Sequence, residues 1–169
     1  MNRRWNRPAR LAPGVLAVLA AATVFAPASR APAQNRALLE LLQNATRVDC
    51  RFTEIARADW TAEAAEFASE PVDFSAAFFD IDVESGTAEA EGRFGASYIV
   101  VRYAEGYLHF MQTLSSGPLY LTTVLAQPST DGRLKAVHTR HEYTQVSLPG
   151  YTSRPEMYLG DCSVERAAG

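Results

Sequence analysis

The sequence predicts a mainly β protein, an antiparallel up-and-down meander of roughly seven or eight strands that closes as a barrel. From Val48 onward, apolar and polar residues alternate in runs rich in β-branched and aromatic side chains, as in half-buried strands. A two-layer β-sandwich with adjacent end strands is the alternative. Turn residues separate the runs, namely Ser85-Gly86, Glu105-Gly106, Ser116-Gly117-Pro118, Asp131-Gly132 and Pro149-Gly150.

The two cysteines support the closed arrangement. Cys50 and Cys162 lie on the first and last expected strands. An even number of cysteines in an exported chain indicates a disulfide, with two free buried thiols as the alternative. The bond requires the end strands to meet, as they do in an up-and-down barrel.

A short helix is expected before the first strand, in the segment NRALLELLQNATR (35–47), capped by Asn35 or Gln34. Its apolar stripe at helical spacing predicts packing on the main body. The stripe consists of Leu38, Leu39, Leu41 and Leu42. The later segment DWTAEAAEFASE (59–70) fits either a helical turn or a polar strand and loop.

Residues 1–33 are expected to be a secretory signal peptide. Arginines and no acids occur in residues 1–10, and an apolar run follows from Leu11 to Ala26. The run is shorter than the ~20 residues of a membrane-spanning helix. The small residues Ala31 and Ala33 predict cleavage after Ala33, with an uncleaved anchor as the alternative. Residues 34–169 then form a single extracytoplasmic domain, periplasmic or secreted, without a membrane span.

The charge of the mature chain argues against a nucleic-acid partner. Residues 1–33 hold five of the 16 Lys and Arg residues and none of the 19 acids, so residues 34–169 carry 11 bases, 19 acids and a formal charge of −8. Such a chain repels the phosphate backbone.

The signal peptide, the short helix, CRFTEIARADW (50–60) as a first strand, the hairpin meander and the late cysteine together resemble the small secreted lipocalin-like barrels of the calycin group. The glycine-x-tryptophan signature of lipocalins falls at Ala58-Asp59-Trp60, where alanine replaces the glycine. The resemblance implies that a small apolar or amphipathic molecule is held inside the barrel. The ligand-binding residues expected from the inward-facing positions are Tyr103, Phe110, Leu121, His141 and Tyr143.

The segment HTRHEY (138–143) raises the question of a metal or catalytic site. A zinc protease needs His-Glu-x-x-His on a helix, whereas here the order is His-x-x-His-Glu within a predicted strand. Alternate strand residues point to opposite faces, so His138 and His141 diverge and do not share one metal. The alternation predicts a core-facing set, Val137, Thr139, His141 and Tyr143, and a solvent-facing set, His138, Arg140 and Glu142.

The acidic segment DIDVESGTAEAE (80–91) has the carboxylate spacing of a calcium loop, with Ser85 at the position that needs glycine. A solvated hairpin explains the alternating apolar residues better. The calcium candidates are Asp80, Asp82, Glu84 and Glu91, and the residues expected to face inward are Phe79, Ile81, Val83, Ala88 and Ala90.

No P-loop, G-x-S-x-G or G-x-G-x-x-G motif occurs in the chain, and no cofactor is indicated. The sequence therefore favours a non-catalytic exported protein that binds a small ligand, and an enzyme is the less favoured class. The alternative is an envelope interaction or structural module whose outer sheet face meets a protein partner. That face is expected to include Arg102, His109, Arg140 and Glu142.

Overall fold

The computed structural model describes residues 31–60, 64–91, 97–113, 117–141 and 155–167. Most of the expected signal peptide, Glu142 and Tyr143 lie outside these ranges. Among the described residues, no helix is long and apolar enough to cross a membrane. The elements are α1 (Ala31–Gln43), β1 (Ala45–Trp60), β2 (Ala65–Asp82), β3 (Thr87–Ala90), β4 (Ser97–Ala104), β5 (Tyr107–Thr113), β6 (Leu119–Pro128), the 3-10 turn η1 (Thr130–Gly132), β7 (Leu134–His141) and β8 (Glu156–Arg166).

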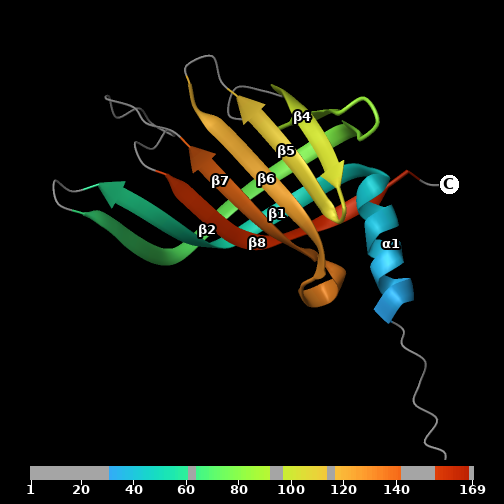
Figure 1. Cartoon of the computed structure of the whole chain (residues 1–169), viewed down its shortest axis with the longest axis horizontal. Coiled ribbons are helices and arrows are strands. Elements are labelled where there is room, and N and C mark those ends of the chain that lie inside the picture. The colour runs from blue at the N-terminus through green and yellow to red at the C-terminus, as the bar shows by residue number, and fades with distance from the viewer. Residues whose placement is uncertain (1–30, 61–63, 92–96, 114–116, 142–154, 168–169) are drawn as a thin grey trace, which may run out of the picture.

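The eight strands form a closed ring (Figure 1). Each strand pairs antiparallel with the next strand in sequence, and β8 pairs antiparallel with β1. The predicted antiparallel meander is therefore confirmed. In a closed ring the first and last strands have neighbours on both sides, so neither is left as a free sheet edge along its paired length.

The disulfide closes this ring covalently. Cys50 and Cys162 are direct register partners on β1 and β8, with their Cα atoms 4.0 Å apart, and their sulfur atoms are bonded. The predicted pairing is confirmed. The two cysteines are 112 positions apart in the sequence. In the chain-entropy view, a loop of this length stabilises the fold by about 4–5 kcal/mol.

The backbones of β1 and β8 approach each other closely beside the disulfide. A Cβ atom added to Gly160 would lie 2.1 Å from the carbonyl oxygen of Arg51 and 2.6 Å from the Cα of Phe52. The register of β1 with both of its neighbours shifts between Phe52 and Glu54, which marks a β-bulge. Glycine at position 160 is therefore required by the contact and not by an unusual φ angle.

Helix α1 covers one end of the ring. Leu42 is fully buried, and a Cβ on Gly106, in the turn between β4 and β5, would lie 3.0 Å from the Leu39 side chain. The helix is placed earlier than predicted: it ends where the side chain of Asn44 donates to the carbonyl of Glu40 (2.7 Å), and β1 begins at Ala45. In segment 59–70, residues 59–60 belong to β1 and residues 65–70 to β2. Of the two alternatives for this segment, the polar strand is therefore correct for these residues.

Phe110, which was expected at an inward-facing position, is buried, as are Ile99, Val101 and Leu108 on β4 and β5. They join a core that runs through the ring. The other buried apolar members are Ala45, Val48, Cys50, Phe52, Ile55, Phe78, Ile81, Ala88, Ala90, Val124, Leu134, Ala136, Tyr158 and Cys162.

The inward assignment of Phe79 was wrong. Asp80 adopts a left-handed φ of 50° and the pairing of β2 with β3 is irregular between Phe79 and Asp82. This bulge resets the alternation, so that Phe78 and Ile81 are buried while Phe79 is half-buried. The sequence alone does not reveal such a bulge, because each residue around Asp80 would also be acceptable in a regularly alternating strand.

The predicted orientation of β7 was also wrong. His138 is buried and His141 is exposed, and Arg140 is on the inward face with His138. The error arises because the β-branched residues on the outer face of this strand also lie beside apolar neighbours: Val137 pairs with Leu159 of β8, and Thr139 with Leu121 of β6. Hydrophobicity therefore did not distinguish the two faces.

We expect Gly160→Ala to lower the free energy of unfolding by about 2–3 kcal/mol, because the new methyl group would push β1 away from β8. Chemical denaturation of the oxidised protein measures this loss. Leu159→Ala is the matched control: its side chain is exposed, so its cost should stay within about 1 kcal/mol. Equal stability of Gly160→Ala and the wild type would contradict the close contact.

Candidate functional site

A cavity of about 450 Å³ lies inside the ring, at the end away from α1. Its residues come from β2 to β7, with Gln112 near the end of β5 that is opposite the Gly106 turn. This volume is in the range of small-molecule sites. The lining residues are Phe74, Ser75, Ala76, Ala77, Phe78, Ala90, Glu91, Ile99, Phe110, Gln112, Tyr120, Thr122, His138 and Arg140.

One wall of the cavity is apolar. The rings of Phe78 and Phe110 stack with their centroids 4.1 Å apart and their planes 10° from parallel. Ala90 of β3 and Ile99 of β4 are also buried, and these two strands lie between β2 and β5 in the ring. We call this apolar part of the cavity lining the apolar slot, because the hydrocarbon part of a ligand can pack against it.

The other wall is polar and comes mainly from β6 and β7. Tyr120 and Thr122 lie on β6 opposite Arg140 and His138 of β7 in the strand register. Gln112 of β5 pairs with Tyr120. The cavity therefore has an apolar side and a side with hydrogen-bonding groups and one guanidinium.

Arg140 is held among aromatic rings. Its guanidinium carbon lies 4.6 Å from the ring centroid of Phe74, 5.0 Å from that of Tyr158 and 5.8 Å from that of Tyr120. Cation–π contacts of this kind favour a fixed guanidinium position. The cation of the cavity is thus positioned by packing rather than left mobile on the surface.

Glu156 supplies the buried negative charge beneath Arg140. Its side chain is 2% exposed and accepts a hydrogen bond from Arg57 Nε at 2.9 Å. The Tyr158 hydroxyl donates to its other oxygen, and Arg140 Nη1 lies 3.8 Å away. Arg57 also pairs with the exposed Glu70 of β2. Burial, together with the Glu156 carboxylate, raises the pKa of the Tyr158 phenol well above its usual range.

His138 is a neutral, hydrogen-bonded member of the same wall. Arg140 Nε lies 3.4 Å from His138 Nε2. A guanidinium only donates, so Nε2 carries the lone pair and Nδ1–H donates to Thr122 Oγ1 at 2.8 Å. Burial, helped by the charge of Arg140, lowers the pKa of His138 to about 3. The imidazole therefore stays uncharged at neutral pH.

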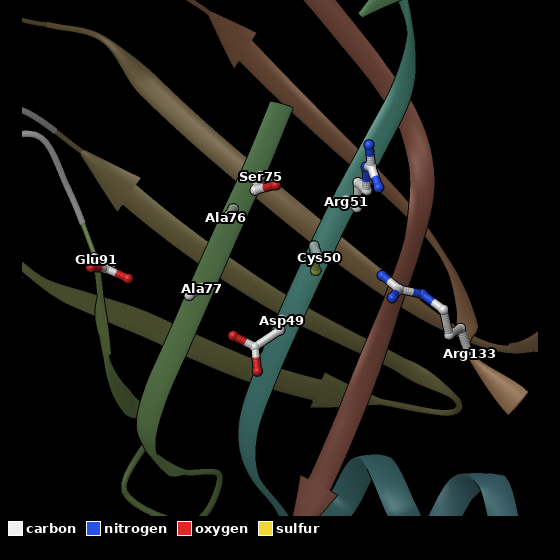
Figure 2. Close-up of a pocket in the computed structure, with 8 residues that line it drawn as sticks. All are labelled: Asp49, Cys50, Arg51, Ser75, Ala76, Ala77, Glu91 and Arg133. Atoms are coloured by element: carbon white, nitrogen blue, oxygen red, sulfur yellow. The ribbon is translucent and has the colours of Figure 1, made fainter. Parts of the chain in front are cut away.

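A second hollow, of about 430 Å³, lies where β1 and β2 run side by side next to the disulfide (Figure 2). Small residues of β2 and Cys50 form part of its lining, and charged side chains surround them. The lining residues are Asp49, Cys50, Arg51, Ser75, Ala76, Ala77, Glu91 and Arg133.

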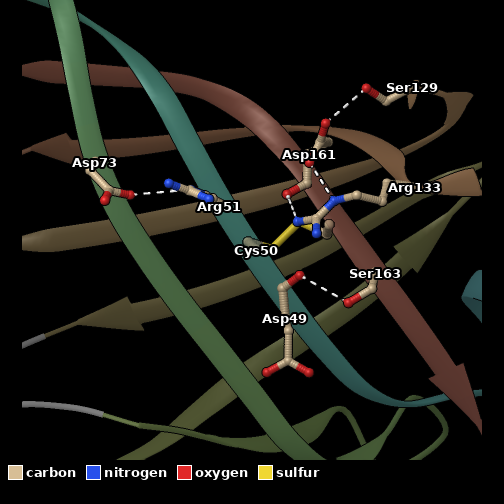
Figure 3. Close-up of polar contacts among 9 residues, drawn as sticks. Asp49, Cys50, Arg51, Asp73, Ser129, Arg133, Asp161 and Ser163 are labelled. Atoms are coloured by element: carbon tan, nitrogen blue, oxygen red, sulfur yellow. Dashed lines mark hydrogen bonds and ion pairs between the residues drawn. A yellow bond between two sulfur atoms is a disulfide. The ribbon is translucent and has the colours of Figure 1, made fainter. Parts of the chain in front are cut away.

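Several charged groups around this second hollow form ion pairs with their neighbours (Figure 3). Arg51 Nε pairs with Asp73 of β2 at 3.2 Å, and Arg133 pairs with Asp161 of β8 at 2.5 Å. Asp49 binds Arg47 through both oxygens, at 2.7 and 2.8 Å. The Arg51–Asp73 pair connects β1 with β2, and the Arg133–Asp161 pair connects the start of β7 with β8, whereas Arg47 and Asp49 both belong to β1. These contacts have a structural role.

The predicted site residues are dispersed. Phe110 lines the cavity, whereas Tyr103 lines a separate hollow of about 780 Å³ near the end of α1. Leu121 pairs with Met111 and Thr139 on the outer face, and His141 is exposed. Tyr143 lies outside the described residues.

The residues that sequence reasoning missed are Phe74, Gln112, Tyr120, Arg140 and His138. A local signal did exist for the last two: Arg140 is two residues after His138, so both share one strand face, and the choice of face alone was in error.

The acidic hairpin does not assemble a metal site. In the part of the chain that the structure describes, no three His, Cys, Asp or Glu side chains gather in a metal-binding group. Asp82 instead accepts the backbone N–H of Ser85 at 2.9 Å, and this hydrogen bonding lowers the pKa of its carboxyl. The carboxylate therefore stabilises the hairpin turn.

Comparisons with protein-family models, with curated proteins and with solved structures give no match for this chain. The chemistry of the cavity is consequently the basis for any functional argument. Its distinguishing content is one aromatic-held guanidinium facing an apolar slot.

The neutral state of His138 predicts acid sensitivity. Its folded pKa of about 3 is below the ~6.5 of an unfolded histidine, so the unfolded chain binds the proton more readily. Stability should be unaffected by this residue above pH ~6.5 and should fall by about 1.4 kcal/mol per pH unit from there toward pH 3. The difference in unfolding free energy between wild type and His138→Gln across pH 4.5–7.5 measures it, because other groups cancel. An imidazole resonance of His138 that titrates near neutral pH would contradict the assignment.

Proposed function

We propose that this protein is a non-catalytic, extracytoplasmic binding protein that holds a small amphipathic molecule inside a lipocalin-like barrel. The single observation that carries the proposal is the cavity of about 450 Å³ with its apolar and polar walls. An interior hollow of this size in a small ring of strands is unusual for a fully packed core, whose voids are rarely larger than a water molecule. It is the expected feature of a ring that encloses a ligand.

The export part of the proposal is supported by the disulfide. Such bonds persist in oxidising compartments and are rare in the cytosol. The amino-terminal arrangement of arginines, apolar run and small residues supports the same location. Periplasm and extracellular space are both compatible with these features.

The state of the titratable groups around the cavity supports binding over catalysis. A general acid or base works best with a pKa near the working pH. The pKa of His138 is far below neutral pH, and the pKa of the Tyr158 phenol is raised above its usual range. Glu156 is covered by Arg57 and Tyr158. These groups form a fixed polar wall, which is suited to orienting a ligand.

A second candidate function, a protein-interaction module, is favoured by a different observation. The outer apolar face, defined here as Val100, Met111, Leu121, Met157 and Leu159, spans β4, β5, β6 and β8 and contains several exposed large side chains. The module was expected to use Arg102, His109, Arg140 and Glu142, but Arg140 is on the inward wall. If the outer apolar face is the surface that binds a protein partner, filling the cavity should leave partner binding unchanged.

The test of ligand binding uses N-phenyl-1-naphthylamine, an uncharged fluorescent probe that brightens in apolar sites. Ala76 lines the cavity and packs against the core, so Ala76→Leu and Ala76→Phe fill it in two steps. We expect probe affinity to fall in the order of added volume, by on the order of 10-fold or more for Ala76→Phe.

Leu121→Phe, which places the same aromatic side chain on the outer face, is the control and should bind as the wild type does. Thermal unfolding of each variant verifies that it is folded. Probe binding that survives both Ala76 variants would rule out the cavity as the binding site. Native mass spectrometry of protein secreted by its own host, before and after denaturation, would then identify any molecule carried.

A further inference from the structure

We infer that the ligand of this cavity carries an anionic head group, a carboxylate or a similar oxyanion, which binds the guanidinium of Arg140 while the apolar body lies along Phe78 and Phe110. The inference rests on the proposed binding function and names the chemical class of its ligand.

The first argument is the hydrogen-bonding capacity of Arg140. A guanidinium has five N–H donors. Among the described residues, the hydrogen bond of Arg140 is the one from Nε to His138 at 3.4 Å, and its Nη1 lies 3.8 Å from Glu156, which is beyond hydrogen-bond distance. Its side chain is only 20% exposed. A guanidinium withdrawn from water to this degree gains from an acceptor that can meet its paired Nη donors.

The second argument is the charge balance beneath the cavity. Two guanidinium groups, those of Arg57 and Arg140, face the one buried carboxylate of Glu156. Glu156 is bound closely by Arg57 and the Tyr158 hydroxyl, and loosely by Arg140. The second carboxylate on Arg57, that of Glu70, is 56% exposed and screened by water. Within the described part of the chain, the charge of Arg140 is therefore incompletely compensated at the cavity wall.

The third argument is that the other described residues around the cavity add little charge, so the positive charge of Arg140 dominates the electrostatics of the cavity. His138 is neutral and uses its lone pair on Arg140, so it adds orientation and no charge. The one acid that lines the cavity among the described residues is Glu91, which is exposed and follows β3, half-way round the ring from β7. A cationic ligand would meet Arg140 directly, whereas an anionic one would be attracted to it.

The fourth argument is pre-organisation. The rings of Phe74 and Tyr158 contact the guanidinium and limit its rotation. A planar guanidinium fixed in this way matches the two oxygens of a carboxylate, and less conformational freedom is lost when the ligand binds. The apolar slot at Phe78 and Phe110 lines the same cavity, so one amphipathic molecule can use both.

The experiment compares three displacers of N-phenyl-1-naphthylamine with the same chain: decanoate, decan-1-ol and decylamine at pH 7.5. Decanoate should bind the wild type on the order of 10-fold to 100-fold more tightly than decan-1-ol, as expected for a charge-assisted hydrogen bond, and decylamine should bind most weakly. Arg140→Gln should abolish the preference for decanoate while the probe and decan-1-ol still bind.

Two further variants control this result. Lys135→Gln removes an exposed cation from the same strand and should keep the wild-type preference. Arg140→Lys keeps the charge without the planar fork, so decanoate affinity should fall while its advantage over decan-1-ol is partly retained. If Arg140→Gln proves unfolded by circular dichroism, the Arg140→Lys comparison carries the test.

Equal displacement by the three compounds, or a decanoate preference that survives Arg140→Gln, would overturn the anionic head group and leave the binding function standing. Failure of the wild type to bind the probe and, by calorimetry, decanoate would overturn both. Preference for decylamine would assign the head-group site to Glu91 or Glu156 instead.

Discussion

The pairing of β1 with β8 is the constraint on which the rest of the structure depends. It converts a linear meander into a ring, and the cavity lies in the interior that this closure encloses. The Cys50–Cys162 bond fixes the register of this pairing, and Gly160 permits the close approach at the neighbouring bulge. The ion pair between Arg133 and Asp161 reinforces the connection between β7 and β8 beside it. The cavity residues on β2 and β7 keep their positions because these strands flank the closed pair.

The two ends of the ring have different chemistry. At one end α1 inserts Leu42 into an apolar core, which is stabilised by removal of hydrocarbon from water. At the other end the interior contains Glu156, Arg57, Arg140 and His138, whose burial is unfavourable unless each finds a partner. A core chosen for stability alone would not require these charges. Their concentration beside a cavity is the feature on which the proposed binding function rests.

The sequence predicted the features that depend on many residues at once. The meander followed from turn residues and alternation along the chain, and the disulfide from the positions of Cys50 and Cys162. The inward faces of β4 and β5 were also predictable, because Arg102 contrasts with buried Val101 and Ile99. The features that failed depend on one or two residues each. A left-handed Asp80 shifted the face of β2, and the β-branched residues Val137 and Thr139 on the outer side concealed the orientation of β7. The charged wall was missed for that reason: Glu156 faces inward beside Arg57 of β1, Arg140 faces inward against the ring of Phe74 of β2, and cross-strand partners of this kind are not visible in one sequence.

The covalent closure also changes what a protease can do to this molecule. Cys50 follows the helix and Cys162 lies close to the end of the last strand, so every connection between strands is inside the loop that the disulfide closes. A single cut in any of these connections leaves two fragments that are still joined by the sulfur–sulfur bond and by the strand pairs on either side. The nicked protein would keep its mass apart from one added water until a reductant separates the pieces. In an environment rich in proteases, the first cleavage is therefore not equivalent to loss of the molecule.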